Sequence, residues 1–169
     1  MAEELISFPR TEAVFRQLAE EVKAGYIKNL QDSKHPTRYG QNKLEDTITT
    51  QVTVDGKSFT ASLRMNKYWE YIEYGTGPAR GREKYWPNSS AIAKWIEIKP
   101  VIPRPDGNGR IPTPKQLTYL ISRKIHDEGI TGTHDFDHAR EAILPKYYEL
   151  IQEALTEDIG DFLWKMLLW

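Results

Sequence analysis

The residues whose types and spacing come closest to a catalytic pattern are two histidines near the start of the last predicted helix. His134 and His138 are four residues apart, with Asp135 and Asp137 between them. On a helix this spacing puts both imidazoles on one face, where they can hold a divalent metal ion. The segment, however, spans the expected helix start, where Asp137 would act as the N-cap and His134 would lie outside the helix. No Glu stands between the histidines as the base of an H-E-x-x-H pattern.

We therefore predict no metal, no cofactor and no catalysis. A small metal-dependent hydrolase that uses His134, Asp135, Asp137 and His138 stays open as the alternative. Gly75–Gly81 contains three glycines but lacks the Gly-Lys-Ser/Thr ending of a phosphate-binding loop. The chain contains no cysteine, which excludes a thiol nucleophile, an iron–sulfur cluster and a Cys-ligated zinc site.

Composition favours one folded domain over residues 1–169. The chain has 39% hydrophobic residues and 11% aromatic residues, more aromatic content than disordered chains carry. Its 23 basic and 24 acidic residues nearly balance, which excludes a generally basic nucleic-acid binder. The first residues lack the pattern of a signal peptide, and no apolar stretch approaches the roughly 20 residues of a membrane span. We expect a non-secreted protein with no membrane contact.

The expected fold class is α+β, with a long N-terminal helix, an antiparallel β-ribbon and three further helices. Apolar residues four apart predict an amphipathic helix over 11–30, with Thr11 as its N-cap. A β-hairpin is expected over 47–64, after a loop from Gln31 to Asp46. Residues 77–112 are expected to form extended loops that contain one short helix, over 89–99. Residues 113–169 are expected to form a helical C-terminal part.

The hairpin pattern is specific enough to predict a register. Asp55-Gly56 is typical of a two-residue type I′ turn, which would place Val54 opposite Lys57 and Val52 opposite Phe59. One face of the ribbon is then mostly apolar and the other polar, as a half-buried ribbon requires. A slip by one residue would destroy that separation.

Two helices are expected in the C-terminal part. Thr113-Pro114-Lys115-Gln116 is typical of a capping box with Pro at the first helical position, and Gly129 is the expected left-handed cap at the end of that helix. The last helix is expected to begin near Asp137, with Pro145 producing a kink near its start. Its predicted apolar stripe consists of Leu144, Tyr148, Ile151, Leu155, Ile159, Phe162 and Met166.

Charge and apolar residues are distributed unevenly along the second half of the chain. Gly75–Lys115 contains eight basic and three acidic residues, whereas the chain from Pro145 onward contains two basic and five acidic ones. Two solvated faces would account for this, but so would head-to-tail association of identical copies. A nucleic-acid patch that combines Arg80, Arg82 and Lys84 with Trp86 is a third interpretation.

The segment Phe162–Trp169 is apolar on nearly every face of a helix and must be covered on all sides. A partner surface and back-folding onto the hairpin and first helix are both open. The residues predicted to form interfaces are Arg80, Arg82, Lys84, Trp86, Arg104, Arg110, Phe162, Trp164, Met166 and Trp169.

One short segment resembles a known family. Tyr68–Thr76 has the sequence YWEYIEYGT, and it is similar to the pattern of the tailed-bacteriophage neck and tail-completion proteins: Tyr, a second Tyr three residues on, an aliphatic residue, Glu, an aromatic residue and Gly-Thr. The positions that match are Tyr68, Tyr71, Ile72, Glu73, Tyr74, Gly75 and Thr76. The order of elements also matches that family, and its Pro-aromatic block before the last helix corresponds to Phe136 and Ala139, with Asp135 in place of the proline.

The resemblance implies a structural virion protein, made in the bacterial cytoplasm, that forms a homo-oligomeric ring at the head–tail junction. The implied neighbours are portal, connector or tail proteins, and contact with the packaged DNA stays open. From the residues themselves, we expect Tyr68, Tyr71 and Ile72 to pack beneath the hairpin. We also expect Thr76 to cap the turn, and the carboxylate of Glu73 to pair with backbone N–H groups, Arg80 or Arg82.

Overall fold

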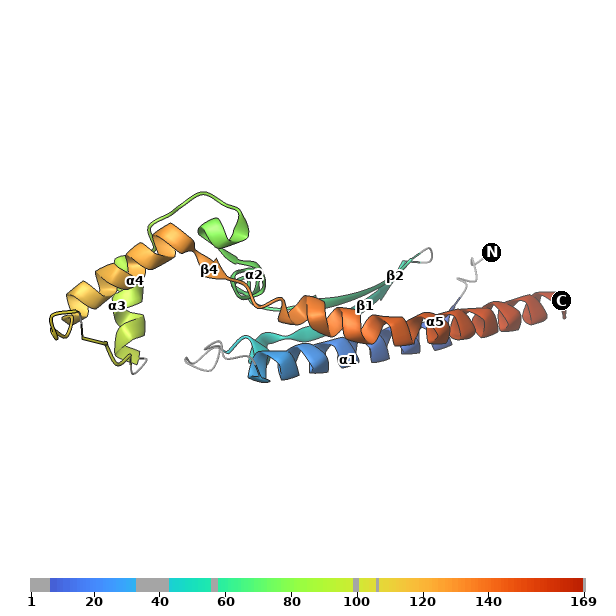
Figure 1. Ribbon diagram of the computed structural model, residues 1–169. Helices are drawn as coiled ribbons and strands as arrows, with labels where there is room; N and C mark the ends of the chain where they lie inside the picture. Colours follow the sequence, from blue (N-terminus) through green and yellow to red (C-terminus); the bar gives the residue numbers. More distant parts are fainter. Residues whose placement is uncertain (1–6, 33–42, 56–57, 99–100, 106, 169) are drawn as a thin grey trace. The chain divides into compact units, whose positions relative to one another are not determined.

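The computed structural model describes residues 7–32, 43–55, 58–98, 101–105 and 107–168 (Figure 1). Its mixed helical and strand content confirms the predicted fold class. The elements are α1 (Pro9–Asp32), β1 (Thr49–Val54), β2 (Phe59–Arg64), α2 (Trp69–Tyr74), β3 (Gly75–Thr76), α3 (Ser89–Ile98), α4 (Pro114–Glu128), β4 (Ile130–Thr131) and α5 (Asp135–Leu167). Short 3-10 turns occur at Glu45–Thr47 and Gly77–Arg80.

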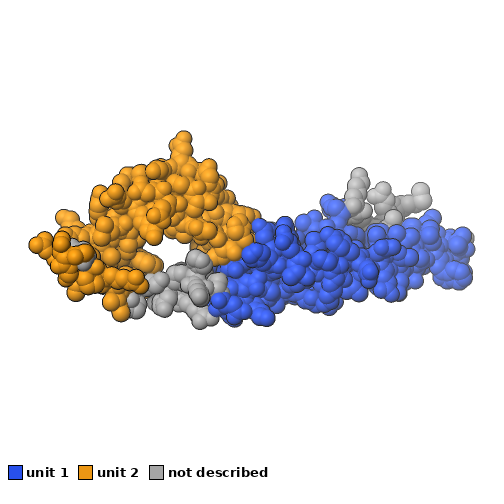
Figure 2. All heavy atoms as spheres, viewed as in Figure 1, with its two compact units in different colours: residues 1–35, 42–67, 135–169 blue, residues 36–41, 68–134 orange. Residues whose placement is uncertain are grey.

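The chain divides into two compact units (Figure 2). The first unit comprises residues 1–35, 42–67 and 135–169, and the second comprises residues 36–41 and 68–134. Among the described helices, none is both long and apolar enough to cross a lipid bilayer.

The first unit is built on α1 and α5, which lie side by side and run antiparallel (Figure 1). At one end, the Asn29 side chain donates a hydrogen bond of 2.9 Å to the carbonyl of Asp135. Midway, the Lys146 ammonium contacts both carboxylate oxygens of Glu21 at 2.9 Å. The core between the helices centres on Leu18, Val22 and Tyr147. Burial, and then the nearby Glu21 carboxylate, raise the pKa of Tyr147 to about 12.

The N-terminus of α1 is held by a residue from the far end of α5. The buried Asp158 carboxylate accepts hydrogen bonds of 2.9 Å from both the backbone N–H and the hydroxyl of Thr11, and one of 3.3 Å from the N–H of Arg10. Helix N-termini leave their first N–H groups without partners, and a carboxylate there also favours the helix dipole. The prediction of Thr11 as N-cap is therefore wrong: it lies within the helix, and Asp158 does the capping.

The electrostatic environment of Asp158 keeps its carboxylate charged. Burial alone would raise the pKa of Asp158, but the hydrogen bonds from Thr11 and Arg10 outweigh burial, so that this pKa lies below its ordinary value. The Arg10 guanidinium lies 3.4 Å from Asp158 and 2.6 Å from the more exposed Asp161. Asp158 thus acts as a buried ionic anchor between the two helices.

The hairpin forms as predicted, but in a different register. Val54 pairs with Phe59 and Val52 with Ala61, two residues away from the predicted partners. The turn begins one residue later than predicted: Asp55 pairs with Ser58, whose carbonyl accepts a hydrogen bond of 3.3 Å from the Asp55 N–H, and the Asp55 carboxylate accepts from the N–H and the hydroxyl of Ser58. Gly56 and Lys57, on which the predicted turn depends, lie outside the described residues. A shift of two keeps the same residues on the same face, so the apolar face survives.

That apolar face packs on α1. The Phe59 ring stacks on Phe15, with ring centroids 5.3 Å apart, and meets the edge of Phe8 at 5.7 Å. The predicted packing of Tyr68, Tyr71 and Ile72 beneath the hairpin stays a prediction. The motif belongs to the second unit.

The predicted stripe of α5 is correct in part. Leu144 and Ile151 pack against the core, whereas Tyr148, Ile159 and Met166 are exposed. The buried residues of the helix are Asp135, Ala139, Tyr147, Ala154 and Asp158. Small residues on the buried face let α1 approach closely, as at Gly25, where an added Cβ would lie 3.4 Å from that of Ala139. Apolar periodicity misses this face because its residues include alanines and an aspartate.

The second unit contains the helices predicted over 89–99 and from Thr113 to Gly129. The capping box of α4 is confirmed: the Gln116 N–H donates to Thr113 Oγ1, and the Thr113 N–H donates to the Gln116 side chain. Gly129 ends the helix with a φ of 77°. The short helix α2 was not predicted. Residues 101–105 and 107–112 form the expected loop without regular structure.

Two predicted boundaries change. The last helix begins at Asp135, so that Asp137 lies in its first turn and is not the N-cap. It continues through Pro145 to Leu167. Helix α1 extends to Asp32, and most of the predicted loop from Gln31 to Asp46 lies outside the described residues.

Replacing Asp158 with alanine is expected to lower the free energy of unfolding by about 2–3 kcal/mol, because it leaves the N-terminus of α1 without its cap. The matched control is Asp161→Ala, which removes a more exposed carboxylate from the same arginine and is expected to cost less than about 1 kcal/mol. Urea denaturation followed by circular dichroism measures both. Equal losses would show that Asp158 acts only as a surface charge.

The contribution of Asp158 is also expected to depend on pH. Its pKa is lower in the folded chain than in the unfolded one, so ionisation stabilises the fold above the unfolded value of about 3.9. The stability difference between the wild type and Asp158→Asn should be constant near neutral pH and shrink as the pH falls below about 4. A difference that stays constant into acid would contradict this assignment.

Candidate functional site

The motif Tyr68–Thr76 folds into a short helix, a glycine and a strand. Helix α2 ends at Gly75, whose φ is 75° and whose N–H donates to the carbonyl of Tyr71. Strand β3 then pairs antiparallel with β4, with Gly75 opposite Thr131 and Thr76 opposite Ile130. The motif thereby joins a segment that is distant along the chain.

Three glycines make this pairing unusually close. An added Cβ would lie 2.0 Å from the Ile130 carbonyl oxygen at Gly75, 2.2 Å from the Thr76 carbonyl oxygen at Gly129 and 2.1 Å from the Glu73 carbonyl oxygen at Gly132. These contacts are with backbone atoms, which cannot move aside as a side chain can. We call residues 73–77 and 129–132 the glycine lock. Gly129 and Gly132 were not predicted to act with the motif, and no local sequence signal connects them to it.

Two further hydrogen bonds extend the glycine lock toward α5. The Thr133 N–H donates to the carbonyl of Ile72 at 2.9 Å, and the His134 N–H donates to the carbonyl of Glu73 at 3.1 Å. Thr76 does not cap the following turn through its side chain. Its hydroxyl is buried and has no hydrogen-bond partner among the described residues.

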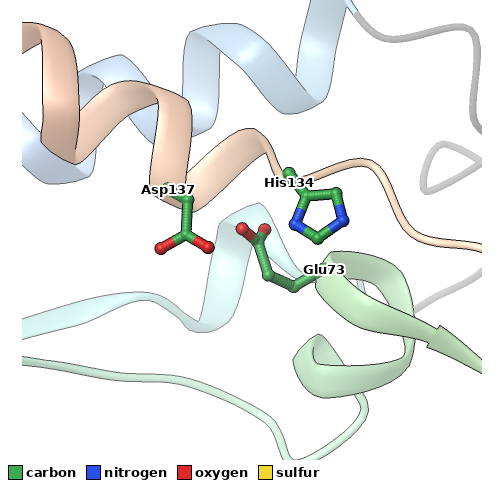
Figure 3. A group of neighbouring side chains, drawn as sticks. All are labelled: Glu73, His134 and Asp137. Carbon is green, nitrogen blue, oxygen red and sulfur yellow. The ribbon is translucent and has the colours of Figure 1, made fainter. Parts of the chain in front are cut away.

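Glu73 is the fully buried acid of the motif. A carboxylate oxygen of Glu73 lies within 4.8 Å of a ring nitrogen of His134 (Figure 3). Arg80, one expected partner of Glu73, instead pairs with Glu70 at 3.9 Å, and its guanidinium lies 5.0 Å from the centre of the Tyr74 ring. His134 itself has a φ of 55°, rare for a residue other than glycine.

The four residues of the hydrolase alternative are divided between the two units. His134 belongs to the second unit, whereas Asp135, Asp137 and His138 lie in the first turn of α5, in the first unit. Asp135 is buried, the Asp137 carboxylate pairs with Arg140 at 3.2 Å, and His138 is exposed. The hydrolase alternative stays an untested hypothesis.

The predicted basic residues fall into three groups. Arg80 and Arg82 line a pocket of about 520 Å³ together with Tyr71, Thr76 and Tyr85, so the structure brings part of the motif and two of the predicted arginines together. Arg104 and Arg110 lie in the loop between α3 and α4, where both are exposed.

Lys84 and Trp86 face α4 instead. The Trp86 ring stacks on His126 with centroids 4.4 Å apart and on Tyr119 at 6.2 Å. The Lys84 ammonium lies 3.6 Å from Asp127. The hydrogen bond with His126, and then the charge of Lys84, hold the pKa of Asp127 below its usual range despite opposition from partial burial. Trp86 therefore has one face committed to packing.

The apolar end of α5 is exposed. Phe162 is half-buried, but Trp164 is 66% exposed and Leu167 is 80% exposed. Met166 is exposed as well, and Trp169 lies outside the described residues. The described part of the chain does not fold this segment back onto the hairpin and α1, which was the alternative to a partner surface.

Comparison of the chain with protein-family models, with curated proteins and with solved structures finds no match.

The glycine lock predicts that Gly75→Ala is severely destabilising. The new Cβ would combine an unfavourable positive φ with a contact of 2.0 Å to backbone, and we expect a cost of about 3 kcal/mol or more. Gly81→Ala is the matched control, because Gly81 has a φ of 69° but no atom within 4 Å of the position that a Cβ would take, so that about 1 kcal/mol is expected. Thermal unfolding and amide hydrogen exchange of β4 measure the difference. Similar effects of the two substitutions would mean that only φ, and not close approach, requires glycine.

Proposed function

We propose that this protein is a structural component of a tailed-bacteriophage virion. In this proposal, identical copies form a ring in the neck, connector or tail-completion assembly through which DNA passes, and the protein catalyses no reaction. It is made in the cytoplasm of the bacterial host and ends in the virion, next to portal, connector or tail proteins.

The motif Tyr68–Thr76 carries this proposal. Its sequence resembles that of the neck and tail-completion proteins, and its residues have a consistent structural role here. Gly75 and Thr76 belong to the glycine lock, and Glu73 and Tyr74 pack beside His134. A motif that fixes the backbone of two distant segments suits a subunit whose shape matters more than its reactivity.

Exposed apolar surface supports the proposal that the protein assembles with other subunits. The end of α5 exposes Leu163, Trp164, Met166, Leu167 and Leu168, and the second unit exposes Tyr71, Trp86, Ile98, Tyr119 and Leu120. Soluble monomers rarely expose contiguous apolar patches of more than a few hundred Å², whereas subunits of assemblies cover such surface with each other. Two such surfaces on one chain favour a subunit with two neighbours.

Contact with DNA enters as a secondary part of the proposal. Arg80 and Arg82 beside the exposed Tyr71 and Tyr85 would suit non-specific contact with phosphates. A chain with nearly equal numbers of acidic and basic residues, however, favours protein neighbours over a dedicated nucleic-acid module.

The proposal is tested in the phage that encodes the protein. Deletion of the gene is expected to leave DNA-filled heads and separate tails, and gold-labelled antibody against the protein is expected to mark the head–tail junction of wild-type particles. Electron microscopy provides both measurements. A plasmid copy that carries Gly81→Ala, which leaves the glycine lock intact, should restore normal tailed particles. This restoration shows that the deletion does not act through neighbouring genes. Normal tailed particles from the deletion, or particles without label, would refute the proposal.

A further inference from the structure

The second unit contains an apolar groove between α3 and α4. Its volume is about 680 Å³, within the range of pockets that bury ligands, and most of its lining is apolar. Trp86 and Tyr119 stack on each other and contribute to this lining together with Ala93, Ile96 and Pro114. The two helices around the groove have only one buried residue among those described, Ser122. A pair of helices with so little buried surface is incomplete as a packed layer.

Ser122 lines the groove and is 2% exposed. Its hydroxyl has no hydrogen-bond partner among the described residues. The hydroxyl oxygen is shielded from the surface, so an occupant meets the accessible part of the lining, which is mainly apolar. The groove therefore suits an occupant that is mainly apolar.

The last turns of α5 have these properties. Arg10 near the start of α1 pairs with Asp161, so the residues after Asp161 extend beyond that contact. Ile159, Leu163 and Met166 are spaced as the anchors of a helix that binds in a groove, and all three are exposed. The final carbonyl groups of a helix have no partner within the helix and can accept hydrogen bonds.

We propose that the groove between α3 and α4 of one copy receives the last two turns of α5 from a second copy of the chain. The inference rests on the proposed function, for which it names the contact that joins neighbouring subunits. Leu163, Met166 and Leu167 enter the apolar lining.

Charge also fits this pairing. Lys115 lines the groove, where its ammonium faces the negative end of the incoming helix dipole. Glu97, the acidic residue of the lining, matches Lys165, the basic residue of the last turns of α5.

The contact joins two different surfaces, so that each copy offers one end and one groove. Such a heterologous contact propagates from copy to copy and closes into a ring when the rotation permits. A contact between two α5 ends would instead be symmetric and stop at a dimer. The two arrangements respond differently to variants.

Complementation of two defective variants distinguishes them. The end variant is Leu163→Asp with Leu167→Asp, and the groove variant is Ala93→Glu. Each alone is expected to weaken self-association by about tenfold or more, since buried apolar anchors dominate such interfaces. Mixed in equal amounts, they should form a dimer of one chain of each kind, because one working end meets one working groove. Size-exclusion chromatography with light scattering measures the masses.

The control is Tyr148→Asp, an exposed position in the first half of α5, which should assemble like the wild type. A monomeric wild type at high concentration, a groove variant that assembles normally, or a mixture that stays monomeric would each overturn the inference. Circular dichroism establishes that the variants are folded. If gold-labelled antibody marks the neck but the mixed variants do not form a dimer, only this contact is refuted. If the mixed variants form a dimer but the antibody does not label the virion, only the proposed function is refuted.

Cross-linking provides a test that does not depend on disrupting the groove. Because the chain contains no cysteine, a copy with Leu167→Cys and a copy with Thr118→Cys each carry a single thiol. Mild oxidation of the mixture should give a disulfide-linked heterodimer at a rate above that of a Tyr148→Cys and Thr118→Cys mixture. Equal rates for the two mixtures would contradict the proposed docking.

Discussion

The antiparallel contact between α1 and α5 determines the rest of the first unit, and the Asp158 carboxylate fixes how the two helices align. Apolar packing alone lets a pair of helices slide, because one leucine replaces another at small cost. Asp158 prevents this sliding, because it binds the unpaired N–H groups that occur only at the start of α1. Asn29 and Lys146 fix the same alignment at the other end and in the middle. The alignment in turn decides which residues of α5 meet α1 and which extend past Asp161.

The second unit is organised by a different principle. Backbone approaches backbone at Gly75, Gly129 and Gly132, where side chains would prevent the contact. This explains why a conspicuous aromatic motif ends in Gly-Thr: the aromatic residues form a short helix, and the glycine lets the chain turn into β3. The tight junction leaves α3 and α4 with little to pack against inside the second unit. The second unit therefore combines a tightly packed backbone at the glycine lock with two helices, α3 and α4, that bury little surface.

The sequence allowed prediction where structure depends on neighbouring residues. The capping box at Thr113 and Gln116 and the helix stop at Gly129 were correct because both sides of each interaction lie within one turn. The hairpin was found but its pairing is shifted by two residues, because Asp55 pairs with Ser58 through both its backbone N–H and its side chain and so does not form the centre of the turn. Asp158 could not have been found, because its partner Thr11 is 147 residues away and an aspartate in an apolar stripe looks like a surface residue. For the same reason, nothing local predicted that Gly129 and Gly132 meet the aromatic motif, or that Ser122 lines a groove.

The sparse burial within α3 and α4 has a consequence for how the molecule behaves before it meets another copy. Segments with few buried apolar contacts open at a lower free energy than the global transition, so the two helices would unfold locally while α1 and α5 stay intact. In the proposed assembly, ordering the two helices would draw on the free energy of association, which lowers the net affinity of the contact. The proposed subunit would therefore resist polymerisation at low concentration, and α3 and α4 would become rigid on binding a neighbouring copy.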